Sequence, residues 1–203
     1  MKTLLLIDVQ NDFLPGGALP VPEGDVIVPL INALLARFDL VVATQDWHPP
    51  EHGSFAANHP GKRPGEIVQL AGLSQILWPI HCVQNSGGAC FAPGLETRRI
   101  ERIFQKGTDP AIDSYSGFFD NGHRKATGLA NYLRTRDASD VWLAGLATDY
   151  CVKFTALDAV AEGLRATVIE DACRGVNLQP GDASRALDEM RAAGVKVVQS
   201  KDA

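Results

Sequence analysis

The sequence predicts an α/β fold, a three-layer, Rossmann-like sandwich in which helices flank a mostly parallel sheet. Two observations predict it. Short runs rich in Leu, Ile and Val, without polar alternation, recur along the chain and are typical of strands buried on both faces. Segments with the apolar spacing of amphipathic helices stand between these runs, and such alternation favours parallel strands joined by helices.

The first part of the chain is predicted to run strand, helix, strand. Residues 4–9 form an almost uninterrupted apolar run, which indicates the first strand. Residues 25–38 place most of their apolar side chains on one side of a helix, and residues 40–44 are again largely apolar and indicate the second strand.

A long segment, residues 45–95, is dense in Pro, Gly, His and Asn and holds four of the five histidines. Irregular segments of this length in a compact domain are either functional or disordered. The histidines favour a functional segment.

Regular alternation then returns and continues to the end of the chain. The pattern predicts strands at residues 100–106, 141–146, 166–170 and 195–199, and helices at residues 124–136, 148–162 and 182–193. Ligands of such folds bind beyond the carboxyl ends of the strands, so we expect the functional site there.

Composition limits both the domain organisation and the partners. A chain of 203 residues, 45% hydrophobic and without internal repeats, predicts one domain spanning residues 1–203. The net charge of -5 gives no basic surface for nucleic acid or anionic membrane, and it favours a small-molecule substrate. The first apolar run reaches Asp8 too early for a signal peptide, so we expect a cytoplasmic monomer or homo-oligomer with reduced thiols.

Three reactive side chains fall at predicted strand ends: Asp8, Lys106 and Cys151. The carboxyl ends of parallel strands share one edge of the sheet, so these groups are expected to meet. A thiol with a carboxylate as base and an ammonium as partner forms an acyl-transfer apparatus. Taken singly, a strand-end Asp is often a turn residue, and a strand-end Lys is usually solvated.

Cys151 is expected in the first turn of a helix for which Thr148 is the N-cap. Unpaired N–H groups, the positive end of the helix dipole and the Lys106 ammonium would stabilise a thiolate there. The same N–H groups can bind an oxyanion.

A metal site is suggested by Asp46 and His48, which lie two apart on extended chain directly after the second strand, together with His81. Such a nitrogen and oxygen set suits zinc, with iron, manganese or cobalt as alternatives, and three protein ligands leave open positions. His52, His59 and Cys82 are further candidates outside this set, and the simpler interpretation of the whole group is an ordinary polar loop.

Aromatic residues accompany these groups and would suit a slot for a planar ring. Phe13 and Trp78 are expected in the slot, whereas Phe118 and Phe119 are expected in the core. Trp47, Tyr115 and Tyr150 are the remaining candidates.

Five segments of the sequence resemble the bacterial nicotinamidase (pyrazinamidase) family of the isochorismatase-like cysteine hydrolases. The resemblance covers essentially the whole chain, and the segments that carry it are DVQNDF at residues 8–13, DWHP at 46–49, WPIHCVQ at 78–84, DSYSGFF at 113–119 and GLATDYCV at 145–152.

The resemblance implies a six-stranded parallel sheet and hydrolysis of nicotinamide to nicotinate, with a thioester intermediate and a role in NAD salvage. It implies catalytic Asp8, Lys106 and Cys151, and an oxyanion hole from the N–H groups of Ala147 and Cys151 after a cis peptide. A divalent metal, zinc in preference to iron or manganese, would be held by Asp46, His48 and His81, and the ring by Phe13, Trp78 and Tyr115.

Three alternatives stay open on the residues alone. A related cysteine hydrolase of carbamoyl or ureido amides would share the thiol apparatus without needing the metal ligands. A non-catalytic binding domain would hold a structural ion, and a metallohydrolase would use metal-activated hydroxide and would survive loss of the Cys151 thiol.

Overall fold

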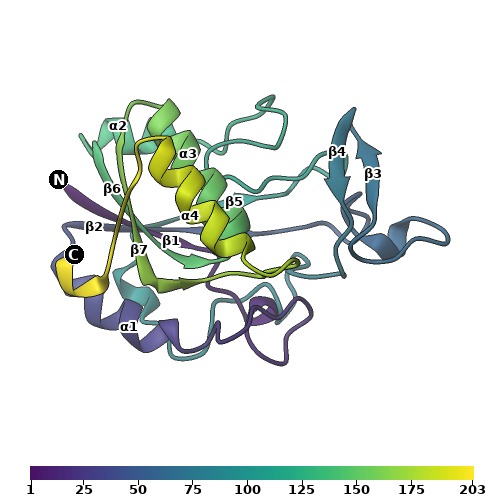
Figure 1. The fold of residues 1–203 in the computed structure, drawn as a ribbon, viewed down its shortest axis with the longest axis horizontal. Coiled ribbons are helices and arrows are strands. Elements are labelled where there is room, and N and C mark those ends of the chain that lie inside the picture. Colours follow the sequence, from purple (N-terminus) through teal and green to yellow (C-terminus); the bar gives the residue numbers. More distant parts are fainter.

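The structure, a computed structural model, describes all of residues 1–203 and contains a six-stranded sheet in which every neighbouring pair of strands is parallel (Figure 1). The predicted α/β fold is confirmed. In spatial order the strands are β5 (Arg102–Lys106), β2 (Leu40–Asp46), β1 (Lys2–Ile7), β6 (Asp140–Leu146), β7 (Arg165–Arg174) and β8 (Lys196–Val198).

Both faces of the sheet are apolar, and β1 shows why. Its side chains alternate between the two faces, so Leu4 and Leu6 pack into one hydrophobic cluster and Leu5 and Ile7 into the other. Helix α1 (Ile27–Leu34) covers the first face. The second face is covered by α2 (Leu129–Thr135), α3 (Lys153–Ala161) and α4 (Asp182–Ala192), and α1 lies opposite α3 and α4 across the sheet (Figure 1).

Element boundaries differ from the predicted ones where side chains compete for the backbone. The helix predicted at residues 124–136 starts only at Leu129, because Asp120 accepts hydrogen bonds from the N–H groups of Gly122, Arg124 and Lys125 and holds that segment as a loop. The helix predicted at residues 148–162 begins as a π-helical turn, Thr148–Val152, and continues as α3.

The long segment after β2 contains a hairpin that the sequence pattern did not predict. Strands β3 (Ile67–Leu70) and β4 (Leu73–Ile76) pair antiparallel as a separate two-stranded sheet, which stands apart from the main sheet (Figure 1). Its turn residues, Ala71 and Gly72, both have positive φ, as the favoured two-residue hairpin turn requires. The hairpin leads directly into the segment that carries Trp78 and His81.

The order of the strands places a crevice beside β1. The chain builds the sheet outward from β1 in one direction through β2 and β5, and then adds β6 on the other side of β1. Ligands of open parallel sheets bind where the order reverses in this way, which here is between the carboxyl ends of β1 and β6.

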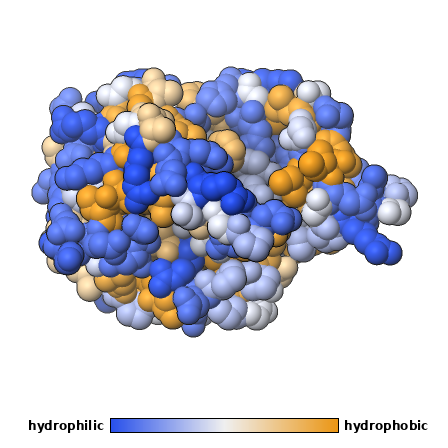
Figure 2. Space-filling view, in the orientation of Figure 1, coloured by the Kyte–Doolittle hydropathy of each residue, from blue (hydrophilic) through white to orange (hydrophobic).

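The face seen in Figure 2 is mainly polar, with hydrophobic groups interspersed among the polar side chains. No helix has the length and apolar character needed to cross a bilayer.

Candidate active site

The reactive residues lie at the carboxyl ends of four adjacent strands. Asp8 follows β1, Asp46 ends β2, Lys106 ends β5, and Cys151 follows β6. Strand β6 approaches β1 closely at Gly145, where an added Cβ would lie 2.1 Å from the carbonyl oxygen of Ile7. Only glycine allows this approach, which brings the segment carrying Cys151 up against Asp8.

Lys106 lies at the centre of the cluster. Its fully buried ammonium donates hydrogen bonds to Asp46 Oδ1 at 2.5 Å, to the carbonyl oxygen of Ser114 at 3.0 Å and to Cys151 Sγ at 3.3 Å. These three bonds use all three N–H groups. Although burial alone would lower the pKa of Lys106, the charges of Asp46 and Asp8 raise it well above its usual value, so the ammonium stays charged.

Each carboxylate oxygen of Asp8 has a neighbouring polar group. Thr44 Oγ1 donates to Asp8 Oδ1 at 2.7 Å. Oδ2 lies 2.8 Å from Lys106 Nζ and forms with it an ion pair in which both side chains are fully buried. Burial raises the pKa of Asp8, and Lys106 opposes this shift. A buried carboxylate with a raised pKa is suited to accept and return a proton.

Burial raises the pKa of the Cys151 thiol well above its usual value, and the charges of Asp8 and Asp46 add to this shift, whereas the Lys106 ammonium lowers the pKa, as expected. A base that takes the thiol proton is therefore part of the chemistry that this site needs. Thr148 is not the predicted N-cap, since Ala147 occupies that position and no side chain caps the turn.

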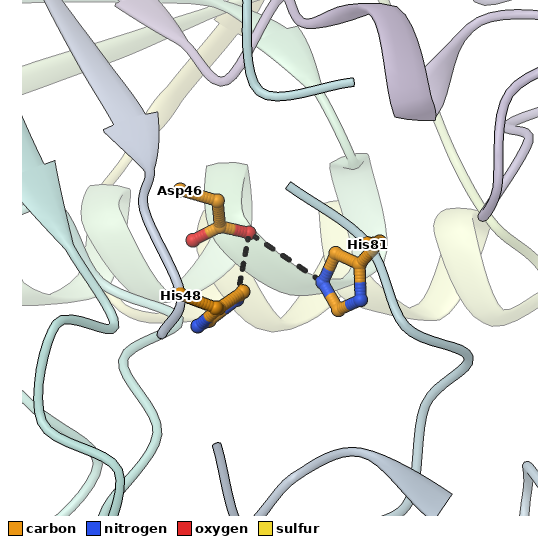
Figure 3. Close-up of side chains that lie close together, drawn as sticks. All are labelled: Asp46, His48 and His81. Carbon is orange, nitrogen blue, oxygen red and sulfur yellow. Dashed lines mark ion pairs between the residues drawn. The ribbon is translucent and has the colours of Figure 1, made fainter. Parts of the chain in front are cut away.

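Asp46, His48 and His81 converge beside this cluster (Figure 3). Asp46 Oδ2 lies 3.7 Å from His48 Nε2 and 3.9 Å from His81 Nε2. The Gln10 amide fixes the Asp46 backbone by accepting a hydrogen bond from its N–H at 2.8 Å and donating one to its carbonyl at 2.9 Å. Although burial would raise the pKa of Asp46, Lys106 and His48 hold it well below its usual range, so a carboxylate faces the two rings.

The tautomers of the two histidines fit a metal site. His48 Nδ1 bonds the carbonyl of Gly107 at 2.9 Å, and His81 Nδ1 bonds the carbonyl of Pro79 at 2.8 Å. A carbonyl can only accept, so each Nδ1 carries a proton, and in the neutral form of each ring Nε2 keeps a lone pair for a metal ion. This donor set suits a divalent ion such as zinc.

The further metal-ligand candidates differ from this set. His52 Nδ1 lies 2.7 Å from Ser54 Oγ, its buried Nε2 has no hydrogen-bond partner, and with His48 and Asp113 it forms a second group whose ligand atoms could hold an ion. His59 Nε2 bonds the carbonyl of Gly53 at 2.7 Å. Cys82 is fully buried in the hydrophobic core.

A pocket opens next to both clusters. Phe13, Trp78 and Tyr115 line it as expected for ring-binding residues, while Trp47 does not and packs against the hydrophobic core instead. Phe118 is buried in the core and Phe119 packs against it, as predicted. The full lining is Phe13, Leu19, Asp46, His48, Trp78, His81, Asp113, Tyr115, Ala147, Tyr150, Cys151 and Val176.

Leu19, Asp113 and Val176 were not found from the sequence. Asp113 stands two residues before Tyr115, so a shared face on extended chain was an available signal. Val176 is brought to the pocket by Asp149, which accepts hydrogen bonds from the N–H groups of Val176 at 2.9 Å and Asn177 at 2.7 Å. That loop has no local pattern that indicates a binding role.

The turn between β6 and α3 brings Ala147 and Cys151 to the same pocket wall. The peptide bond between Leu146 and Ala147 is cis, as the resemblance implied. Val152 N–H bonds back to the carbonyl of Ala147 at 3.0 Å, which makes this a compact π-helical turn.

An open parallel sheet with a thiol, a carboxylate and an ammonium in contact at its strand ends is typical of a hydrolase with a cysteine nucleophile that acts on a small molecule. The model of the isochorismatase domain matches residues 2–202. The chain belongs to the isochorismatase domain family.

The relatives narrow the chemistry. A nicotinamidase of Escherichia coli is 51% identical over 99% of this chain and 96% of its own length. A solved nicotinamidase/pyrazinamidase of Acinetobacter baumanii superposes with a TM-score of 0.96 at 48% identity, covering 99% of this chain and 97% of that one. A pyrazinamidase of Pyrococcus horikoshii, solved in complex with zinc, is 40% identical with a TM-score of 0.79 and 98% coverage of both chains. Together these relatives show that the chain is an enzyme, a hydrolase acting on amides.

Proposed function

We propose that this protein hydrolyses nicotinamide to nicotinate and ammonia through a thioester on Cys151, and that it also deamidates pyrazinamide. The observation that carries the proposal is the contact of Lys106 with both Cys151 and Asp8 at the edge of an aromatic pocket. A planar heteroaromatic amide fits such a slot, with its carboxamide beside the sulfur.

In the first half-reaction Asp8 takes the thiol proton as sulfur attacks the amide carbon. The C–S bond forms, the carbonyl π electrons move to oxygen, and the N–H groups of Ala147 and Cys151 stabilise the oxyanion. When the tetrahedral intermediate collapses, the C–N bond breaks and Asp8 returns its proton to the departing nitrogen, so ammonia leaves and a thioester remains.

In the second half-reaction water attacks the thioester carbon. Asp8 takes one water proton, the C–S bond breaks, and the thiol regains a proton as nicotinate leaves. The raised pKa of Asp8 supports both directions of proton transfer, because its protonated and ionised forms are then closer in free energy near neutral pH.

Lys106 stabilises the negative charge that develops on sulfur after Asp8 becomes protonated. Its hydrogen bond to Asp46 Oδ1 keeps the ammonium in place. The proposal thus assigns Asp8, Lys106 and Cys151 to the chemistry and assigns Phe13, Trp78 and Tyr115 to binding the ring.

Asp46, His48 and His81 would hold a divalent ion, zinc in preference to iron or manganese. The Nε2 lone pairs of the two histidines and the ionised Asp46 support this assignment, as does the zinc complex of the Pyrococcus relative. When bound, such an ion supplies a binding point for the ring nitrogen and so orients the carboxamide.

The alternatives make different predictions. A carbamoyl or ureido amidase of the same family would not need the metal ligands, yet here they border the pocket itself. A metallohydrolase would retain turnover after Cys151→Ala.

We also propose that residues 1–203 form one domain, that the protein acts in the cytoplasm, and that its product nicotinate enters NAD salvage.

Ammonia release from nicotinamide by metal-loaded and metal-free protein tests the proposal. We expect turnover of nicotinamide and pyrazinamide by the loaded protein, little turnover of benzamide, which lacks the ring nitrogen, and strong loss after chelation. Equal turnover of benzamide and nicotinamide would contradict the ring-nitrogen assignment.

A further inference from the structure

The hairpin of β3 and β4 buries one side chain of its two strands, and that side chain is polar. Gln75 is 2% exposed, while the other residues of both strands are exposed or only partly buried. A buried amide without partners is costly, so its contacts must compensate for its burial.

The contacts of Gln75 point to the ring-binding wall. The two N–H groups of its Nε2 are shared among three acceptors, which are the carbonyl of Ile76 at 2.7 Å, Asp113 Oδ2 at 3.0 Å and the hydroxyl of Tyr115 at 3.0 Å. Tyr115 and Asp113 both line the pocket, whereas Gln75 does not. Gln75 therefore contacts the pocket only through its walls.

A second donor reaches the same hydroxyl. Trp78 Nε1 donates to the Tyr115 oxygen at 3.2 Å, so two N–H groups from adjacent parts of one segment meet on one acceptor. The ring of Trp78 stands nearly perpendicular to that of Tyr115, at 85°, and to that of Tyr150, at 87°. The hydroxyl of Tyr115 thus links its own ring to that of Trp78 and to the hairpin.

We propose that Gln75 is a positioning residue for substrate recognition, which holds Tyr115 through its hydroxyl and so keeps the ring slot shaped for the substrate. This inference rests on the proposed function, because it takes Tyr115 as a wall of the nicotinamide slot. The hairpin then acts as a structural support of the pocket, although it contributes no residue that touches the reacting atoms.

A double-mutant cycle tests the inference. The four proteins are the wild type, Gln75→Met, Tyr115→Phe and the double variant. Methionine has nearly the shape of glutamine and lacks the N–H groups. For Gln75→Met we expect KM for nicotinamide to rise about 3- to 10-fold, the effect of one hydrogen bond, with kcat changed less than about twofold. In the Tyr115→Phe background the hydroxyl is absent, so Gln75→Met should add less than about twofold.

Gln69→Met is the matched control, since Gln69 is exposed on the same hairpin and should leave KM unchanged. Nicotinamide binding by calorimetry in a Cys151→Ala background should repeat the KM pattern without turnover. Thermal unfolding checks folding, and Gln75→Leu, which removes the same donor with a different shape, serves if the Met variant does not fold.

The role of Gln75 would be overturned if Gln75→Met raised KM by the same factor in the Tyr115→Phe background as in the wild type. A fall in kcat at unchanged KM would also overturn it. A wild-type protein without ammonia release from nicotinamide would instead contradict the proposed function. If the wild type is active but Gln75→Met and Tyr115→Phe affect KM independently of each other, only the role of Gln75 is contradicted.

Discussion

Lys106 Nζ donates a hydrogen bond to Cys151 Sγ across 3.3 Å, inside a cluster in which the lysine side chain is fully buried. The same ammonium balances the charges of Asp8 and Asp46. The Lys106 ammonium therefore contacts both the Cys151 thiol and the Asp46 carboxylate, which faces His48 and His81.

Lys106→Met should destabilise the protein as well as inactivate it. The substitution leaves two buried carboxylates without a counter-charge, and loss of one partner from a buried ion pair costs about 3–5 kcal/mol. Urea unfolding measures this cost, and Lys125→Met, an exposed lysine, is the control with no expected change. A Lys106→Met protein of wild-type stability would contradict the charge assignments in the cluster.

Asp8→Asn should lower turnover and at the same time make the Cys151 thiol more acidic. Loss of the general acid and base should lower kcat by about 10²–10⁴-fold. The negative charge of Asp8 raises the pKa of Cys151, so its removal should move the pH midpoint of Cys151 alkylation by iodoacetamide downward. Asp25→Asn, at an exposed position, should change neither quantity. A midpoint that moves upward would show that Asp8 does not act on the thiol as described.

His48→Ala should weaken metal binding at least about tenfold and raise KM for nicotinamide. The rate of Cys151 alkylation should change far less, because the proposed ion orients the substrate and does not activate the thiol. His123→Ala provides an exposed histidine as control. If KM and alkylation rate respond equally, the orienting role is wrong.

Gly145→Ala should destabilise the fold by about 1–3 kcal/mol or more through overpacking, because the new Cβ would meet the Ile7 carbonyl at 2.1 Å and the backbone has φ +136. Denaturant unfolding measures the loss. Gly87→Ala, with open space around its Cβ position and no positive φ, should be tolerated. Equal stability of the two variants would contradict the close approach of β6 to β1.

Central strands of the main sheet such as β1 and β2 could be predicted because they are buried on both faces and form nearly continuous apolar runs, which need no long-range information. Strands β3 and β4 could not be predicted in this way. They are short, lie within a Pro- and Gly-rich segment, and bury only Gln75 among their eight residues, so they carry no strong apolar pattern.

The convergence of Asp8, Lys106 and Cys151 followed from their places at strand ends, since parallel strands share a carboxyl edge. The acidity of Cys151 did not follow, because it depends on burial and on the charges of Asp8 and Asp46, which only the folded chain brings near the sulfur. Val176 likewise reaches the pocket through a hydrogen bond to Asp149, a contact between distant residues.

The central claim is that the Cys151 sulfur carries the acyl group. Wild-type protein mixed with nicotinamide, quenched rapidly in acid and analysed by intact-mass and peptide mass spectrometry, should show the added mass of a nicotinoyl group on the peptide that contains Cys151, and Cys151→Ala should show neither adduct nor ammonia release. Sustained ammonia release by Cys151→Ala, with no adduct on the wild type, would contradict the account.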